Sequence, residues 1–221
     1  MQRLCLLLLF TAQPALAANH DGQVWTTIFT RATVAPRVVA HLDAGARFSI
    51  DRNGLATALI RGTLDYAVSD KVELNVAVAR FTTYNDGRET QNENRLHQQI
   101  SGTIARIGAV DLSSRTRLEQ RFVSTGEDTG WRLRQQFRAI APLTKGSRTR
   151  GYLASETFIA FNDTDWGANK GLDQVRTAFG VAFPAGNKLT ADIGYINQWS
   201  NLERREDIIL HIVNIALTAN F

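Results

Sequence analysis

The last stretch of the sequence, Ile209 to Phe221, constrains the fold more than any other. Counting back from Phe221, every second residue as far as Ile209 is apolar, with His211 as the one exception. Polar residues such as Asn214 and Asn220 lie between them. A period of two sends successive side chains to opposite faces of a strand. The sequence therefore ends in a predicted β-strand with one apolar face, which lipid or a protein core would cover.

A strand in this position favours a closed barrel, because an open strand edge in a soluble protein invites aggregation. A terminal aromatic residue after alternating apolar positions also resembles the signal that the barrel-assembly machinery of Gram-negative bacteria reads. We therefore expect two partners for this chain, the assembly machinery, through the strand that ends at Phe221, and outer-membrane lipid. The expected location is the bacterial outer membrane.

The start of the sequence has the three parts of a secretory signal peptide. Arg3 precedes the apolar run Leu4 to Phe10, and the small-residue site Ala15 to Ala17 follows it. This pattern predicts a signal peptide over residues 1–17 with cleavage after Ala17, and one barrel domain over residues 18–221. Cys5, the only cysteine, lies within the signal peptide. The mature chain should therefore have neither a disulfide framework nor a thiolate metal site.

The remaining composition narrows the possible functions. No later apolar run approaches the roughly 18 residues that a spanning helix needs, so a membrane location would require a barrel. Without Arg3 the chain has 24 basic and 21 acidic residues, a net charge of +3, which is too small to predict nucleic-acid binding. The whole chain has 21 arginines and only 4 lysines. Guanidinium groups hold carboxylates and phosphates bidentately, which indicates an interior network or an anion path.

From Gly22 onward the sequence divides into alternating segments of roughly 10 to 16 residues, the pattern of a transmembrane barrel. The candidate strands are Gln23–Ala32, Val38–Ile50, Leu55–Val68, a segment from Val72, Glu93–Ile104, Leu112–Phe122, Trp131–Ala141, Thr149–Phe161, Val175–Phe183, Leu189–Trp199 and Ile209–Phe221. Longer polar loops near Thr83, Ser124, Asn162 and Ser200 alternate with tight turns near Ser69, Arg106, Pro142 and Pro184.

Eleven candidates are an awkward number, because single-chain bacterial barrels usually have an even strand count. With Phe221 in the periplasm, the alternation of loops and turns leaves Gln23 on the wrong side of the membrane. Either the first segment splits and gives 12 strands, or it does not span and gives 10. We predict an all-β, antiparallel, up-and-down transmembrane barrel of 10 to 12 strands, with 12 slightly preferred.

Rows of arginine and glutamate are the sharpest chemical feature. Charges on the lipid face would cost roughly 2 to 4 kcal/mol each near the midplane, so these rows should face the lumen. Neighbouring arginine rows repel unless carboxylates or anions lie between them. The candidate lumen residues are Arg95, Arg115, Arg117, Arg121, Arg132, Arg134, Arg138, Glu93, Glu119 and Glu156. They form either a structural ladder that fills the lumen or a narrow anion-selective path for small acidic solutes such as uronates or phosphates.

Enzyme chemistry finds little support in the sequence. A membrane-embedded, lipid-directed hydrolase would need a histidine beside a serine and an orienting group. His97 with Ser101 is the one arrangement that keeps this alternative open. His41 and Asp43 are predicted to form an inward hydrogen-bonded pair. We predict no enzyme activity, no cofactor and no metal site, since no set of ligands shows the necessary spacing.

Two further expectations concern location. The tryptophans Trp25, Trp131, Trp166 and Trp199 fall mostly near strand ends or loops, as membrane-interface girdles require. A soluble periplasmic β-barrel that binds acidic ligands is the remaining alternative.

The order of several short motifs resembles an uncharacterised barrel family, domain of unknown function 2490. The motifs are Trp25, Arg47, Glu93-x-Arg95, Arg115-x-Arg117-x-Glu119-x-Arg121, Arg132-x-Arg134, Glu156-x-Phe158 and Gly194-Tyr195-x-x-Gln198. The resemblance covers nearly the whole mature chain. It implies an outer-membrane-type β-barrel with arginine and glutamate on inward faces, and it implies no established activity, cofactor or catalytic residue.

Overall fold

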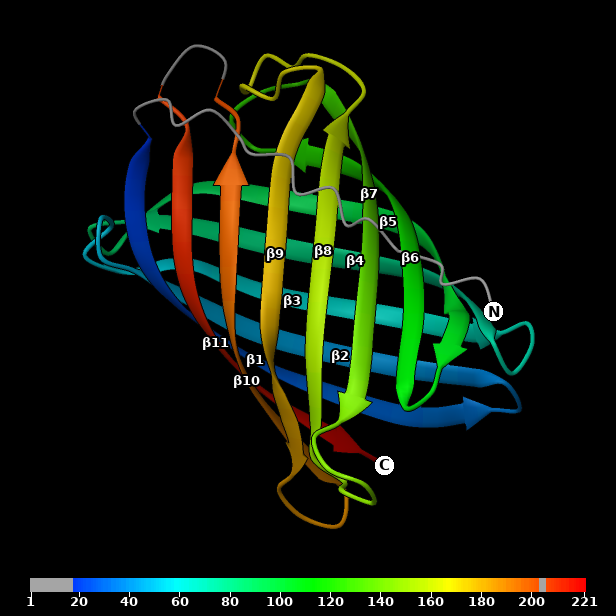
Figure 1. The fold of residues 1–221 in the computed structure, drawn as a ribbon. Helices are drawn as coiled ribbons and strands as arrows, with labels where there is room; N and C mark the ends of the chain where they lie inside the picture. The colour runs from blue at the N-terminus through cyan, green and yellow to red at the C-terminus, as the bar shows by residue number, and fades with distance from the viewer. Residues whose placement is uncertain (1–17, 203–205) are drawn as a thin grey trace, which may run out of the picture.

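In the computed structural model, which describes residues 18–202 and 206–221, the chain forms one closed β-barrel (Figure 1). Each of the eleven predicted segments corresponds to a strand. The strands are β1 (Asn19–Ala35), β2 (Val38–Ser49), β3 (Gly54–Ala67), β4 (Val72–Asn85), β5 (Arg88–Ile107), β6 (Val110–Val123), β7 (Thr129–Pro142), β8 (Arg150–Ala160), β9 (Gly171–Pro184), β10 (Leu189–Ser200) and β11 (Ile208–Asn220). The predicted signal peptide, residues 1–17, lies outside the described residues.

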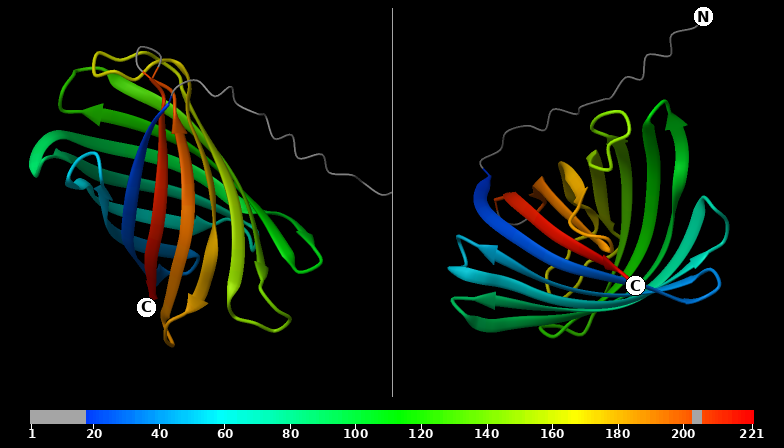
Figure 2. Two further views of the ribbon diagram at one scale, coloured as in Figure 1. Left: turned by 60° about the vertical axis from the view of Figure 1, so that its left-hand side comes forward. Right: turned by 90° about the horizontal axis from the view of Figure 1, so that it is seen from below.

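Strands that are consecutive in the sequence pair antiparallel, and β1 closes the barrel against β11 in parallel. This parallel seam extends from the pair Asn19 and Ile208 to the pair Arg31 and Asn220. An odd number of strands forces the first and last to run in the same direction. The start of β1 and the end of β11 therefore lie at opposite ends of the barrel (Figure 2).

The strand count falls within the predicted range of 10 to 12, but it is neither the preferred 12 nor the alternative 10. The first segment neither splits nor stops short, because β1 is a single strand of 17 residues that pairs on both sides. Its apolar alternation is weak in the sequence because Thr26 and Thr30 occupy outward positions. Their hydroxyls donate to the main-chain oxygens of Ala46 and Leu42 on β2, at 3.3 and 2.7 Å, which satisfies these polar groups locally.

The two faces of the wall are inverted relative to a soluble protein. Large apolar side chains are exposed on the outside, among them Ile60, Val78 and Phe179. Charged side chains fill the inside, where Glu119 is only 1% exposed and Arg132 only 4%. This apolar-out, polar-in arrangement is the one that a barrel in lipid requires. Among the described residues, no helix is long and apolar enough to span a membrane.

The connection between β4 and β5 differs from the expected polar loop near Thr83. Both strands continue to a two-residue turn at Asp86 and Gly87, whose φ angles are 48° and 72°. Positive φ at both central positions is the geometry of the type I′ turn, which Asp-Gly favours. The polar residues on either side of this turn therefore form the end of a long hairpin.

The parallel seam can be tested with a disulfide, because the only cysteine of the sequence, Cys5, lies within the predicted signal peptide. Val24 on β1 and Val213 on β11 are paired, exposed and on the outer face. Cysteines at these two positions should be about 5 Å apart between strands and should form a disulfide on oxidation. Electrophoresis after cleavage between the strands, with and without reductant, measures the cross-link.

The matched control places cysteines at Val24 and Ile209, a register offset of four residues. This pair would be roughly 13 Å apart and should not cross-link. Cross-linking of the offset pair in place of the aligned pair would contradict the parallel register.

Candidate functional site: the interior arginine and carboxylate network

The centre of the interior network is assembled by the register of four strands, β6 to β9. On β6 and β7, Glu119 lies opposite Arg132, and Arg117 lies opposite Arg134. On β8, Glu156 lies opposite Gln136 of β7 and Arg176 of β9. Because alternate residues of each strand point inward, the period-two rows of the sequence become layers of charge across the lumen.

Glu119 is the most buried carboxylate of the network. Its Oε2 accepts hydrogen bonds from Nε and Nη2 of Arg132, at 3.0 and 2.7 Å, and its Oε1 accepts one from Nη1 of Arg134, at 2.8 Å. Arg117 lies 3.6 Å away on the same side. A buried carboxylate needs this number of donors, since removal from water is costly unless both oxygens are paired.

Glu156 forms a second centre joined to the first through Arg134. Arg134 donates Nε and Nη2 to the two oxygens of Glu156, both at 3.0 Å, while also bonding to Glu119. Arg115 donates to Glu156 at 2.9 Å, and Arg176 lies 3.7 Å from it. Arg134 of β7 therefore links a carboxylate of β6 to a carboxylate of β8 along one wall of the barrel.

A third centre lies towards the loops between even- and odd-numbered strands. Glu93 on β5 accepts bonds from Arg95, at 2.8 Å to each oxygen, and from Arg121, at 2.5 and 3.2 Å. The guanidinium of Arg95 also stacks on Phe81 at 3.9 Å from the ring centroid. Aromatic faces stabilise cations at such distances, so the rings supply attraction that carboxylates do not.

Arginines outnumber carboxylates in the middle of the barrel. Ten inward arginines lie there: Arg47, Arg61, Arg95, Arg115, Arg117, Arg121, Arg132, Arg134, Arg138 and Arg176. Eight carboxylates accompany them: Asp21, Asp43, Asp65, Glu93, Glu119, Glu156, Asp173 and Asp192. The interior therefore carries an excess of positive charge.

The excess positive charge lies on arginines that have few or no carboxylate partners. Arg47 stacks on Trp25 at 3.9 Å, and among the described residues no carboxylate forms an ion pair with it. Arg138 lies over the ring of Tyr152 at 4.5 Å. The Nε atoms of Arg115 and Arg138 are buried without a hydrogen-bond partner within the described part of the chain. These groups are the ones an added anion would satisfy.

A polar hollow of about 320 Å³, which we call the vestibule, opens at the end of the barrel where β11 finishes. Its lining includes Lys71, Ser101, Ser113, Arg115, Gln136 and Arg138, with Asp70 and Glu73 also present. Of the three arginines whose buried Nε atoms have no partner among the described residues, Arg115 and Arg138 line this hollow and Arg150 does not.

The structure places all ten predicted lumen residues inside the barrel. Nine of them, Arg95, Arg115, Arg117, Arg121, Arg132, Arg134, Glu93, Glu119 and Glu156, join the three centres, and Arg138 lines the vestibule. Their use as an anion path stays a prediction. Sequence reasoning did not include Arg47, Arg61 and Arg176 among the site residues. Each is the only arginine of its strand's inward face, so no row distinguished it.

Two interpretations of single residues were wrong. His41 pairs with Asp65 at 2.7 Å, and Asp43 pairs with Arg61, because cross-strand neighbours are closer than residues two apart on one strand. Trp25 belongs to no interface girdle. It is 7% exposed inside the barrel, where it packs with Ile196 and Ile212 beneath the seam.

His97 is buried against the neighbouring strand β4. It is 2% exposed and its Nε2 lies 3.1 Å from Oδ1 of Asn75. Within the described residues, no hydrogen bond joins it to Ser101, four positions along the same strand. No group of three or more potential metal ligands occurs among the residues that the structure describes.

A family model described as "Protein of unknown function (DUF2490)" matches residues 22–208. The chain belongs to this family. An uncharacterised protein of Methylorubrum extorquens is 33% identical to this DUF2490 protein over 207 residues, which cover 91% of this chain and 89% of that protein. The family resemblance drawn from the motifs is confirmed.

Solved outer-membrane barrels show a weaker similarity. A loop-deletion mutant of OmpT from Vibrio cholerae is 11% identical with a TM-score of 0.43, over 75% of this chain and 55% of that one. An anion-selective porin from Comamonas acidovorans is 11% identical with a TM-score of 0.37, over 80% and 55%. The DUF2490 chain thus spans about half the length of these proteins. Likeness at this level says nothing about its function.

Removal of the Glu119 charge should destabilise the barrel strongly. A Glu119→Gln substitution leaves Arg132 and Arg134 buried with fewer acceptors, and breaking a buried ion pair costs about 3 to 5 kcal/mol. Urea titration of the folded protein in detergent measures the free energy of unfolding. Glu127→Gln, in the exposed loop after β6, is the control and should change stability by less than about 0.5 kcal/mol. An equal effect of both substitutions would contradict the role of Glu119.

The loops at the opposite end from the vestibule are joined by Asp165. Its carboxylate accepts main-chain N–H bonds from Glu127 and Asp128, at 2.7 and 3.2 Å, and these bonds lower the pKa of Asp165. Trp166 donates its Nε1 to the main-chain oxygen of Asp128 and lies over Arg121. Because the folded-state pKa is depressed, the loop contact should persist at neutral pH and be lost as pH falls through this lowered value.

Trp166 fluorescence, taken as the difference between wild type and Trp166→Phe, reports this contact. We expect a red shift only at pH values below the ordinary aspartate pKa of about 3.9, and already at neutral pH in Asp165→Ala. A wild-type transition at or above the ordinary value would contradict the proposed bonds.

Proposed function

We propose that this DUF2490 protein is an outer-membrane β-barrel whose lumen is closed at mid-height and whose vestibule binds small anions such as phosphates or carboxylates. The observation that carries the proposal is the excess of inward arginines in a lumen that side chains already fill. The proposal combines the two interpretations of the arginine rows, a structural ladder and an anion path. Most of the arginines pair with carboxylates and fill the lumen, and the arginines of the vestibule would bind an anionic solute.

The exposed apolar wall supports a membrane location over a soluble periplasmic one. Ile60, Val78 and Phe179 are 52%, 63% and 54% exposed, and similar side chains surround the barrel. Soluble monomers rarely expose contiguous apolar surface on this scale. Lipid around the wall would cover it, and the charged side chains inside would stay away from lipid.

Packing inside the barrel supports closure, since Arg47 of β2 and Arg176 of β9 both lie over the ring of Trp25 on β1, at 3.9 and 5.0 Å. Arg134 binds Glu119 and Glu156 together, and the ring of Phe158, 1% exposed, lies 4.4 Å from its guanidinium. Each bond is charge-assisted and shielded from water, so the arrangement should be rigid. A rigid layer of this kind obstructs steady ion flow.

The vestibule supplies what an anion needs. Arg115 and Arg138 have buried Nε atoms without partners, and Ser101, Ser113 and Gln136 offer further polar contacts. A phosphate or carboxylate has several acceptor oxygens, and arginine binds such groups through two parallel donors.

Current measurements in planar bilayers test closure. The wild-type barrel should insert without steady conductance, because buried charged side chains such as Arg132 and Glu119 fill the lumen. Arg117→Ala combined with Arg134→Ala removes two of the side chains that fill it and should produce fluctuating current. Heat-dependent electrophoretic mobility confirms that both proteins are folded. Steady anion-selective current through the wild type would replace the closed barrel with a pore.

Binding of inorganic phosphate tests the vestibule. Calorimetric titration of the detergent-solubilised barrel at low salt should show saturable binding, and Arg115→Gln with Arg138→Gln should weaken it by at least about tenfold, since hydrogen bonds to charged groups are lost. Glu156 keeps Arg134 and Arg176 in this variant, so the network should remain folded. Arg148→Gln, in the exposed turn before β8, is the matched control. Equal loss in the control, or no binding by the wild type, would contradict the proposal.

A further inference from the structure

The outer face of β4 and β5 changes abruptly from apolar to polar. Along β4, Leu74, Val76 and Val78 face outward, and the next outward residue is Arg80. On β5 the last apolar outward residue falls at the same level, because Leu96 pairs with Val78 and Asn94 pairs with Arg80, although Gln98 is a polar outward residue within the band. From this level to the Asp86 turn, the outward side chains of the hairpin are polar or aromatic. This level is therefore the edge of the apolar band.

Arg80 differs from the interior arginines. Its side chain is exposed on the outer wall, and its Nη1 lies 3.4 Å from Oδ1 of Asn94, a long hydrogen bond. No carboxylate forms an ion pair with it within the described part of the chain. A guanidinium at the edge of an apolar band lies where lipid headgroups begin, and most of its donors are available to them.

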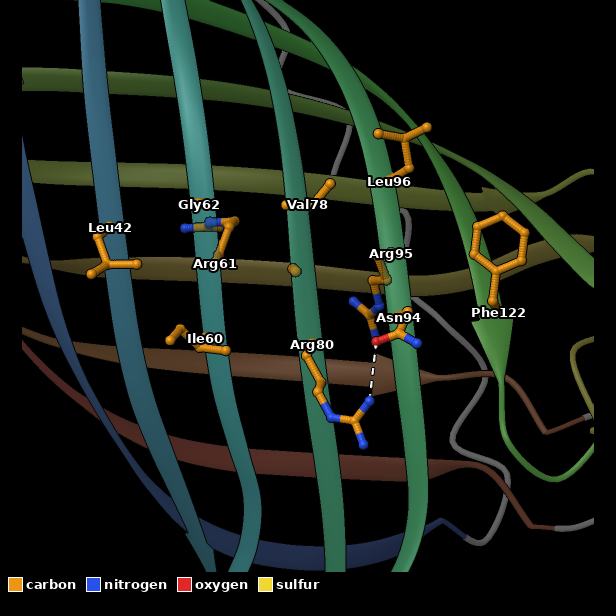
Figure 3. A pocket seen from close by; sticks show the side chains of 11 residues that line it. Leu42, Ile60, Arg61, Gly62, Val78, Arg80, Asn94, Arg95, Leu96 and Phe122 are labelled. Atoms are coloured by element: carbon orange, nitrogen blue, oxygen red, sulfur yellow. Dashed lines mark hydrogen bonds between the residues drawn. The ribbon is translucent and has the colours of Figure 1, made fainter. Parts of the chain in front are cut away.

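A groove on the outer wall begins beside Arg80. It has a volume of about 480 Å³, within the range of small-molecule sites, and its apolar lining comes from Leu42, Ile60, Val78, Leu96 and Phe122 (Figure 3). Gly62 lies between Leu42 and Val78 in the paired strands. A Cβ atom at Gly62 would meet nothing within 4 Å, so the absence of a side chain there leaves the groove open.

We propose that this groove binds a phosphorylated membrane lipid, with one acyl chain over Gly62 and the phosphate on Arg80 and Asn94. The arrangement matches an amphiphile, since an apolar channel ends at an unpaired cation at the boundary of the band. A free anion would not need the channel. A second copy packed about a two-fold axis through this site would bring Arg80 against Arg80, and like charges repel.

The inference rests on the proposed membrane location and is independent of anion binding in the vestibule. Native mass spectrometry of the folded barrel in detergent, with phosphatidylglycerol added, counts retained lipid directly. Diacylglycerol with the same chains and inorganic phosphate serve as separate probes of the chain and of the anion. Insertion of the same protein into vesicles is scored in parallel.

We expect one phosphatidylglycerol to be retained by the wild type, and about tenfold less in Arg80→Gln, because charge-assisted bonds to phosphate are lost. Gly62→Leu should reduce retention similarly while keeping the charge, since its Cβ meets no atom within 4 Å and the rest of its side chain would occupy the groove. The matched controls are Arg88→Gln at the end of the same hairpin and Ala191→Leu on the outer face of β10. Both should retain lipid as the wild type does.

Three results would overturn the lipid site. They are equal loss in Arg88→Gln, undiminished retention in Gly62→Leu, and binding of inorganic phosphate at Arg80 as strong as that of lipid. If the barrel inserts into vesicles but retains no lipid, the lipid site alone fails. If it does not insert, the membrane location fails with it.

Discussion

Arg134 and the two carboxylates that share it are the interaction on which the rest of the interior depends. A guanidinium has five donors in a fixed plane, so it can satisfy Glu119 and Glu156 at once, which a lysine could not do with the same geometry. Each carboxylate then recruits further arginines from β6, β7 and β9. The strong preference for arginine over lysine in the composition reflects this shared, bidentate bonding.

The network also explains how so narrow a barrel is filled without an apolar core. Among the described residues, the buried apolar cluster consists of Trp25, Ile196 and Ile212, beneath the parallel seam. Elsewhere charged side chains take its place, stacked on Phe81, Phe158 and Tyr152. Buried ion pairs contribute little net stability in general, but leaving one member unpaired is expensive, so the network favours a single register of the strands.

Much of the fold followed from the sequence, because a barrel in lipid is governed by a period of two that single residues can reveal. The eleven segments and the inward direction of Glu93, Glu119 and Glu156 were predictable on this basis. The odd number of strands was not predictable, because the pairing of β1 with β11 depends on contacts between the two ends of the chain. For the same reason, His41 was assigned to Asp43 on its own strand and not to Asp65. Isolated arginines such as Arg47 and Arg176 were missed because each is the only arginine of its strand, so no row of charges marked it.

The parallel seam constrains how such a barrel is built. In an up-and-down barrel with an even number of strands, the start of the first strand and the end of the last strand lie at the same end of the barrel. Here the start of β1 and the end of β11 lie at opposite ends of the barrel. In the proposed membrane location these two ends lie on opposite sides of the membrane, so one end of the chain has crossed its plane by the time the hydrogen bonds between β1 and β11 are complete.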